Sequence, residues 1–414
     1  MRLLYIVLLY LLGPFLWVSL WFRGRGMPAY RHRRFERFGH VEPVGGGVAV
    51  WLHAVSVGEV MAALPLIRAL VAKHPPGQVY VTTGTPTGSE RLRVALGDQV
   101  RHSYAPYDLP HVVYRFLHRV QPQQVVVMET ELWPCLYRQL RRRGIPLVIA
   151  NARLSPRSMR GYARIGGFTR SVLADVSLVA AQSPEDAGRY RQLGAPRVST
   201  LGNLKFDVEP DADQLAAGRA DRARWGGVPV WVAASTHEGE DEVMLASHRR
   251  LRQRHPQAVL ILVPRHPQRF DRVATLIAEQ GWVLQRRSDG GPASSPPAVL
   301  LGDSMGEMWR YLAMADAAFV AGSIAPIGGH NVLEPAVLGC PVLFGPHMHN
   351  FLPARDLLRQ AGGAIEVAGA DALAAQLGAW FDAPEHARAV GAAAAAALAG
   401  SRGALAAHLK VLAP

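Results

Sequence analysis

Short polar motifs follow several apolar runs in this chain, and their residue types could support acid–base and anion-binding chemistry. Residues 53–59 read H-A-V-S-V-G-E, which predicts a tight turn at Gly58 and places Glu59 at the start of a helix. The helix dipole favours the ionised carboxylate, the form that a general base needs. A glutamate that only stabilises its helix is the more ordinary interpretation of the same pattern.

Charged residues also follow a second apolar run, and one lysine lies at the junction between the two halves of the chain. Glu129 and Glu131 come after an apolar run, and an extended chain would point both side chains to the same side. Such a pair is costly unless solvated or bound. We expect it to stabilise charge or position a sugar hydroxyl, because no Asp or His partner for a metal lies close in sequence. Lys205 could neutralise a leaving phosphate, or could simply pair with Asp207 on the surface.

Residues 322–335, G-S-I-A-P-I-G-G-H-N-V-L-E-P, predict a glycine-rich turn between a strand and a helix. Glycine N–H groups can approach an anion closely, and Glu334 could hold a ribose hydroxyl; an ordinary turn fits equally well. Arg265 follows another predicted strand, placed to grip a phosphate or carboxylate or to pair with a nearby acid. Ser304 and Glu307 form a predicted capping box. Together these loops resemble a nucleotide-binding face.

The elements that must position these motifs alternate between short apolar runs and helical stretches. Buried parallel strands of a first domain are predicted at 48–52, 79–83, 125–128, 147–150 and 178–181. Residues 205–227 read as a connector, after which strands are predicted at 230–234, 259–263, 299–302, 317–321 and 342–344. Two doubly wound α/β domains predict a ligand cleft between them, at the carboxyl ends of the strands.

Composition limits the class of protein. The chain has 414 residues, a net charge of +13 and 49% hydrophobic residues, which indicates a globular protein with an acidic partner. Two cysteines, Cys135 and Cys340, are expected to stay reduced. Residues 3–22 are almost wholly apolar, long enough to span a bilayer or lie in one leaflet. Six arginines follow between residues 23 and 37, which predicts a cytoplasmic flank able to bind anionic lipid.

Seven motifs, taken in order, resemble the Kdo transferases, which add 3-deoxy-D-manno-octulosonic acid (Kdo) to the lipid A precursor. They cover nearly the whole chain and read H-A-V-S-V-G-E (53–59), M-E-T-E-L-W-P (128–134), N-A-R-L-S (151–155), G-N-L-K-F-D (202–207), V-P-R-H-P (263–267), D-S-M-G-E-M (303–308) and G-G-H-N-V-L-E-P (328–335).

The resemblance implies an inverting glycosyltransferase of GT-B fold that uses CMP-Kdo and requires no metal. By motif matching, Glu59 resembles the general base, while Glu129 and Lys205 resemble stabilisers of the transition state. The implied CMP-binding positions are Pro264, Arg265, Met305, Gly306, Glu307, Asn331, Val332, Leu333 and Glu334. Supporting positions are Ser56, Gly58, Glu131, Gly328, Gly329 and His330.

The predicted organisation is a membrane anchor (1–22), an acceptor-binding domain (23–207) and a CMP-Kdo-binding domain (208–414) whose last helix could pack back on the first. Expected partners are CMP-Kdo, the lipid A precursor and the anionic cytoplasmic face of the inner membrane. A UDP-sugar transferase or 2-epimerase is the second interpretation. A membrane-tethered protein that binds nucleic acid is disfavoured, because no aromatic stacking platform is interleaved with the positive charge.

Overall fold

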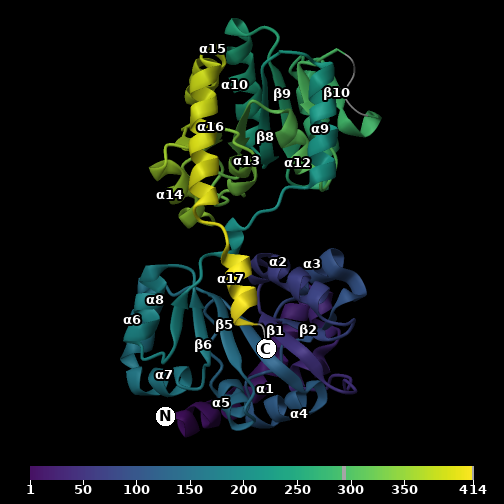
Figure 1. Cartoon of the computed structure of the whole chain (residues 1–414). Helices are drawn as coiled ribbons and strands as arrows, with labels where there is room; N and C mark the ends of the chain where they lie inside the picture. The colour runs from purple at the N-terminus through teal and green to yellow at the C-terminus, as the bar shows by residue number, and fades with distance from the viewer. Residues whose placement is uncertain (291–294, 413–414) are drawn as a thin grey trace. The chain divides into compact units, whose positions relative to one another are not determined.

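A computed structural model describes residues 1–290 and 295–412, apart from the side chains of residues 14, 16 and 17. Within it the chain forms two compact units (Figure 1). The first contains Met1–Asp207 together with the segment that begins at Arg402, and the second is Val208–Ser401. The predicted second domain runs to residue 414 with a last helix that could pack back on the first domain, and in the structure this helix does belong to the first unit.

The first unit is built on a parallel sheet of seven strands in the order β3-β2-β1-β4-β5-β6-β7. The strands are β1 (Val48–Ala54), β2 (Val79–Thr83), β3 (Arg101–Tyr104), β4 (Pro122–Met128), β5 (Leu147–Ala152), β6 (Leu178–Ala181) and β7 (Val198–Thr200). The helices are α1 (Arg2–Gly26), α2 (Val57–Lys73), α3 (Pro86–Leu96), α4 (Pro110–Val120), α5 (Pro134–Arg142), α6 (Pro156–Arg164), α7 (Gly166–Leu173), α8 (Pro184–Gln192) and α17 (Ala404–Val411).

The strands of this sheet are apolar on both faces because helices cover both. Trp51 of β1 packs with Phe116 of α4 in one core, and its neighbour Leu52 packs with Leu66 of α2 in the other. Parallel strands buried on both faces give continuous apolar runs in sequence. All five strands predicted for this domain are therefore present.

The second unit repeats the plan with strand order β10-β11-β9-β8-β12-β13-β14, again all parallel. The strands are β8 (Val230–Thr236), β9 (Val259–Pro264), β10 (Leu284–Arg286), β11 (Val299–Leu301), β12 (Ala317–Val320), β13 (Val342–Phe344) and β14 (Ala364–Glu366). The helices are α9 (Ala212–Arg224), α10 (Glu240–Arg254), α11 (Phe270–Glu279), α12 (Met308–Met314), α13 (Leu333–Val337), α14 (Leu352–Gln360), α15 (Ala370–Asp382) and α16 (Pro384–Ala399).

The predicted connector at 205–227 is wrong, because most of it is helix α9. The Asp211 side chain caps this helix by accepting the N–H of Gln214 at 3.0 Å. Gly218 lies against α12, where an added Cβ would approach the Arg310 carbonyl oxygen within 2.3 Å. Because α9 buries only Gly218 and Asp221, it lacks the apolar periodicity that marks a helix in sequence.

The apolar N-terminal segment forms α1, which is tied to the first unit by polar contacts. Arg2 pairs with Asp175 at 2.9 Å, and the Tyr5 hydroxyl donates to Asp108 at 3.0 Å. The helix also exposes many apolar side chains, at Leu3, Leu4, Val7, Leu8, Leu11, Leu12, Phe15, Val18, Trp21 and Phe22. The predicted basic flank is only partly exposed, since Arg37 is buried against the Tyr104 ring.

Two stretches among the described residues have the length and apolarity of a membrane span. One is Pro384–Val411, which contains α16 and α17. Both helices bury apolar side chains in the units to which they belong, at Val390 and Leu398 in α16 and at Ala404 in α17. The other is α1, whose two halves, Arg2–Gly13 and Val18–Gly26, have this length and apolarity when they are taken together. The two halves are bent by 55° relative to each other.

Candidate active site

Three neighbouring strands of the first unit end beside the predicted acidic residues. β1, β4 and β5 are adjacent in the sheet, and Glu59, Glu129 and Asn151 lie at or beyond their carboxyl ends. Adjacent parallel strands present these ends at one edge. The carboxyl groups are close enough that Glu131 and Glu129 both raise the pKa of Glu59. The sequence motifs of this unit are thus brought together at the carboxyl ends of the strands.

Glu59 lies in the first turn of α2 and completes its N-terminal cap. Ser56 accepts the N–H of Glu59 at 3.2 Å, while the Glu59 carboxylate accepts the Val55 N–H at 2.8 Å and the Ser56 hydroxyl at 3.0 Å. Burial outweighs these hydrogen bonds and raises the pKa of Glu59 to about 7. A carboxyl group that exchanges its proton near neutral pH suits a general base, and a helix cap has no need of such a pKa.

Two details of the predicted geometry are wrong. Gly58 makes no tight turn, because it is the second residue of α2 and an added Cβ would meet only the Ser56 Oγ, at 3.8 Å. The segment after β4 is not extended either, since Glu129 has a left-handed φ of 57°. The chain therefore turns at Glu129, and the two glutamates of the motif acquire different partners.

Glu129 is the glutamate that contacts the predicted lysine. The Lys205 Nζ lies 3.5 Å from the Glu129 Oε1, whereas the Glu131 carboxylate accepts the indole N–H of Trp133 at 2.9 Å. The surface pairing of Lys205 with Asp207 is absent, because the Asp207 carboxylate accepts the backbone N–H groups of Gly403 and Leu405. A half-exposed cation beside a carboxylate is thus available at this sheet edge.

In the second unit, the predicted anion-binding turn already holds an internal anion. Glu240 is fully buried at the start of α10. Its carboxylate accepts the backbone N–H groups of Gly322 at 2.7 Å, Ser323 at 3.0 Å, Ile324 at 3.0 Å, Ala325 at 3.2 Å and His237 at 3.0 Å. Glu240 was not among the residues predicted to have a role. The sequence does contain a signal for this role, because Glu240 directly follows Gly239 at the start of α10.

The paired glycines of this turn serve close packing. Gly328 and Gly329 have φ values of 108° and 78°, and a Cβ added to them would approach the Asn350 Nδ2 within 2.3 Å and the Met348 Sδ within 2.2 Å. The Gly329 N–H donates to the Gly322 carbonyl oxygen at 2.7 Å. These glycines therefore hold the turn against residues 348–350.

The end of the turn lies near Arg265. Asn331 accepts the N–H of Leu333 and donates to the Glu334 carboxyl group, both at 3.1 Å. Burial raises the pKa of Glu334, while Asn331 and the charge of Arg265 lower it. Burial also lowers the pKa of His330 to about 4, and His237 and Arg265 act in the same direction. The loops after β9 and β12 thus face one another, and Val332, next to Asn331 in the chain, is fully buried.

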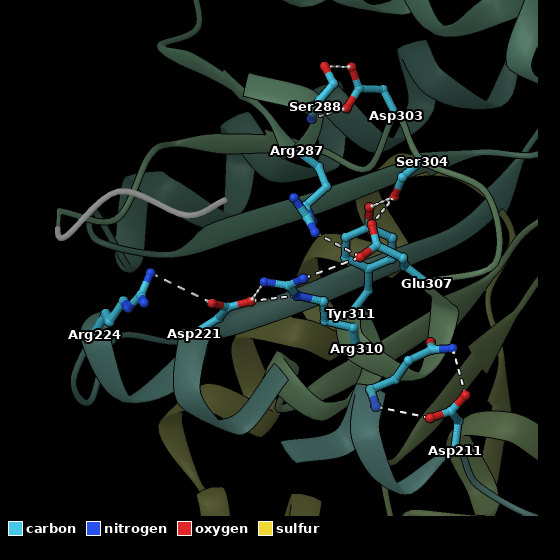
Figure 2. A network of polar contacts seen from close by, with 11 residues as sticks. Asp211, Asp221, Arg224, Arg287, Ser288, Asp303, Ser304, Glu307, Arg310 and Tyr311 are labelled. Atoms are coloured by element: carbon cyan, nitrogen blue, oxygen red, sulfur yellow. Dashed lines mark hydrogen bonds and ion pairs between the residues drawn. The ribbon is translucent and has the colours of Figure 1, made fainter. Parts of the chain in front are cut away.

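The third predicted loop of this unit, Met305–Glu307, is held by a polar network (Figure 2). The Glu307 carboxylate accepts from Arg287 at 2.8 Å and from Arg310 at 3.2 Å, and Arg310 also contacts Asp221 of α9 at 2.6 Å. The predicted capping box is wrong, because the Ser304 hydroxyl contacts the Glu307 side chain and α12 begins one residue later, at Met308. Gly306 has a φ of 81°, which glycine adopts at little cost.

Pro264, the last residue of β9, leads directly into Arg265. The neighbours of β9 in the sheet are β8 on one side and β11 on the other, and β12 lies next to β8. The loops that carry Arg265, Glu307 and Glu334 therefore follow strands of one sheet at the same edge. The predicted convergence of these loops is present within the second unit.

The loss of Glu240 is expected to weaken the second unit. A Glu240→Gln side chain keeps one acceptor oxygen but turns an NH₂ donor toward backbone N–H groups, and each buried donor left unpaired costs about 1–3 kcal/mol. We expect a lower midpoint of urea unfolding. Glu238→Gln is the matched control, because Glu238 pairs with Arg272 at the exposed surface. Equal midpoints for the two variants would contradict the role assigned to Glu240.

Two parallel α/β units, each with charged loops at the carboxyl ends of its strands, define the GT-B fold class. A solved glycosyltransferase from Rickettsia africae has the same fold, with a TM-score of 0.54 and 13% identity over 89% of this chain and 98% of that one.

Sequence comparison then identifies the family. The family model of 3-deoxy-D-manno-octulosonic-acid transferase (kdotransferase) matches residues 32–208. The 3-deoxy-D-manno-octulosonic acid transferase of Haemophilus influenzae is 42% identical over 94% of this chain and 92% of its own length, and that of Bordetella pertussis is 40% identical over 86% and 85%. The chain belongs to the Kdo transferase family, as its motifs predicted.

Proposed function

We propose that this protein transfers Kdo from CMP-Kdo to the lipid A precursor, with inversion at the anomeric carbon, in lipopolysaccharide biosynthesis. The observation that carries the proposal is the cluster of Glu59, Glu129 and Lys205 at one sheet edge, in a chain of the Kdo transferase family. Glu59 removes the proton from the acceptor hydroxyl as that oxygen attacks. Lys205, held by Glu129, stabilises the negative charge that develops as the CMP phosphate leaves.

The second unit binds the CMP part of the donor in this proposal. Its support is the convergence of the loops that carry Pro264 and Arg265, Met305–Glu307, and Asn331–Glu334. Arg265 contributes positive charge for the phosphate, and the loop residues provide polar groups for the nucleoside. Glu240 occupies the backbone donors of Gly322–Ala325, so the phosphate binds elsewhere in this face. The proposed chemistry includes no metal.

The acceptor is a lipid, and two features support action at the cytoplasmic face of the inner membrane. The exposed apolar side chains of α1 provide the surface that enters the bilayer. The net charge of +13 favours an anionic lipid surface and a phosphorylated acceptor. Holding the enzyme at the membrane restricts its search for acceptor to two dimensions.

Mass spectrometry of the lipid product tests this proposal. Detergent-purified protein incubated with CMP-Kdo and tetra-acylated lipid A precursor is expected to add the mass of one or more Kdo residues. UDP-GlcNAc in place of CMP-Kdo is expected to give no product. Product from UDP-GlcNAc alone, or no Kdo product from folded protein and intact CMP-Kdo, would overturn the assignment.

A further inference from the structure

The last helix of the chain, α17, contributes buried polar contacts to the part of the first unit that carries Lys205. Figure 1 shows α17 in yellow among elements from the first half of the sequence, and it packs on α2. Lys205 lies in a short 3-10 turn, Leu204–Phe206, and α17 is linked to the backbone on both sides of it.

The link after Lys205 is a helix cap. Gly403, the N-cap residue of α17, has no side chain with which to cap the helix. The Asp207 carboxylate provides the cap instead, because it accepts the Gly403 N–H at 2.6 Å and also the N–H of Leu405. The residue two positions beyond Lys205 is thereby fixed to the start of α17.

The link before Lys205 passes through His408, which is fully buried in α17. Its Nε2 lies 3.0 Å from the backbone nitrogen of Asn151, and its Nδ1 lies 2.7 Å from the Ala404 carbonyl oxygen. A backbone N–H can only donate and a carbonyl oxygen can only accept, so the neutral ring carries its proton on Nδ1 and accepts at Nε2. Burial lowers the pKa of His408 and so favours this neutral form.

Asn151 connects His408 to the segment that contains Lys205. It is a bulged residue at the end of β5 with a left-handed φ of 51°. Its Oδ1 accepts the N–H of Leu204 at 3.0 Å, and Leu204 directly precedes Lys205. The residue before Asn151 is also engaged, since the Ala150 carbonyl oxygen accepts the N–H of Glu129 at 3.0 Å. Both members of the Lys205–Glu129 pair are thus one hydrogen bond from the strand end that His408 holds.

We propose that His408 is a positioning residue for the Lys205–Glu129 pair and acts through Asn151. The inference rests on the proposed function, because the pair matters for catalysis only if the protein transfers Kdo. His408 touches no reacting atom in this scheme. Its role is to fix the bulge at Asn151, which fixes the backbone of Leu204 and hence the place from which the Lys205 side chain extends.

A second role for α17, filling the core, must be separated from this one. Ala404 is buried, and Leu405 and Leu409 pack against the same core. Leu409→Ala is therefore the control, because it weakens the docking of α17 and leaves His408 and its partners in place. We expect Leu409→Ala to lower Tm and to leave kcat unchanged.

His408→Phe and Asn151→Gly each break one link in the chain of hydrogen bonds that runs from His408 through Asn151 to Leu204. The first removes the contact between His408 and Asn151, and the second removes the contact between Asn151 and Leu204. Asn151→Gly tolerates the left-handed φ and keeps the backbone N–H for His408, but removes the oxygen that holds Leu204. We expect each variant to lower kcat for Kdo transfer by about 10- to 100-fold, the size of effect expected for a misplaced catalytic group, with KM for CMP-Kdo unchanged. His408→Gln, whose side chain can present an oxygen near the place of Nε2, is expected to recover part of the lost kcat.

The deciding experiment is a double-mutant cycle with Lys205→Met. If His408 acts through Lys205, His408→Phe has little further effect on kcat in the Lys205→Met background. An equal loss in both backgrounds would overturn the proposal. Hydrogen exchange gives a readout without substrate, since the Leu204 amide is expected to exchange faster in Asn151→Gly while the Leu405 amide is unchanged. If the wild-type protein transfers no Kdo but Asn151→Gly shows this exchange pattern, the proposed function is refuted, while the chain of hydrogen bonds from His408 through Asn151 to Leu204 still stands.

Discussion

Glu59→Gln is expected to lower kcat for Kdo transfer by about 10²–10⁴-fold, the usual contribution of a general base. The glutamine can still accept the Val55 N–H and the Ser56 hydroxyl, so the cap of α2 and the fold are retained. Binding of CMP, measured by calorimetry, should be unchanged. Glu90→Gln is a suitable control, because Glu90 is an exposed acid of the same unit whose partner is Arg93 on the surface.

The pH profile gives a second readout of the same assignment. Burial raises the pKa of Glu59 to about 7, and the base is the deprotonated form. Activity of the wild-type protein should therefore fall as the pH drops below about 7 and level off above it. The residual activity of Glu59→Gln should not show this fall at low pH, which is the acid limb of the pH profile. Near-normal turnover in the variant, or an unchanged acid limb, would remove Glu59 from the role of base.

Lys205→Met is expected to lower kcat by about 10²–10³-fold, the range seen when one group that stabilises developing charge is removed. Methionine keeps much of the length of the side chain but leaves Glu129 without its cation at 3.5 Å. The effect should appear in kcat at saturating CMP-Kdo rather than in the Kd of the donor, because the phosphate gains most of its charge only as the bond breaks.

Lys73→Met provides the matched control for this variant, since Lys73 is an exposed lysine at the end of α2. Its kcat should equal that of the wild type. A Lys205→Met variant with normal kcat and a raised donor Kd would show that Lys205 binds the ground state and does not stabilise the transition state.

Each strand that was not predicted from the sequence is the outermost strand on one side of its sheet. β3 and β7 are the outermost strands of the first sheet, and β10 and β14 are those of the second. None of the residues of β7 or β10 is fully buried. A strand with one neighbour and a partly exposed face needs no continuous apolar run, so its sequence carries only a weak signal. The central strands are buried on both faces and were all predicted.

The sequence by itself determined the alternation of strands and helices, the family, and the set of residues at the strand ends. These follow from local patterns, because burial on both faces requires apolar runs and the motifs are contiguous in the chain. The tertiary structure decided which of these residues meet. Lys205 contacts Glu129 and not Asp207, Glu240 fills the turn that was expected to bind an external anion, and His408 reaches Asn151. Such contacts join residues up to 257 positions apart, and no local pattern encodes a hydrogen bond that forms only once both segments are packed.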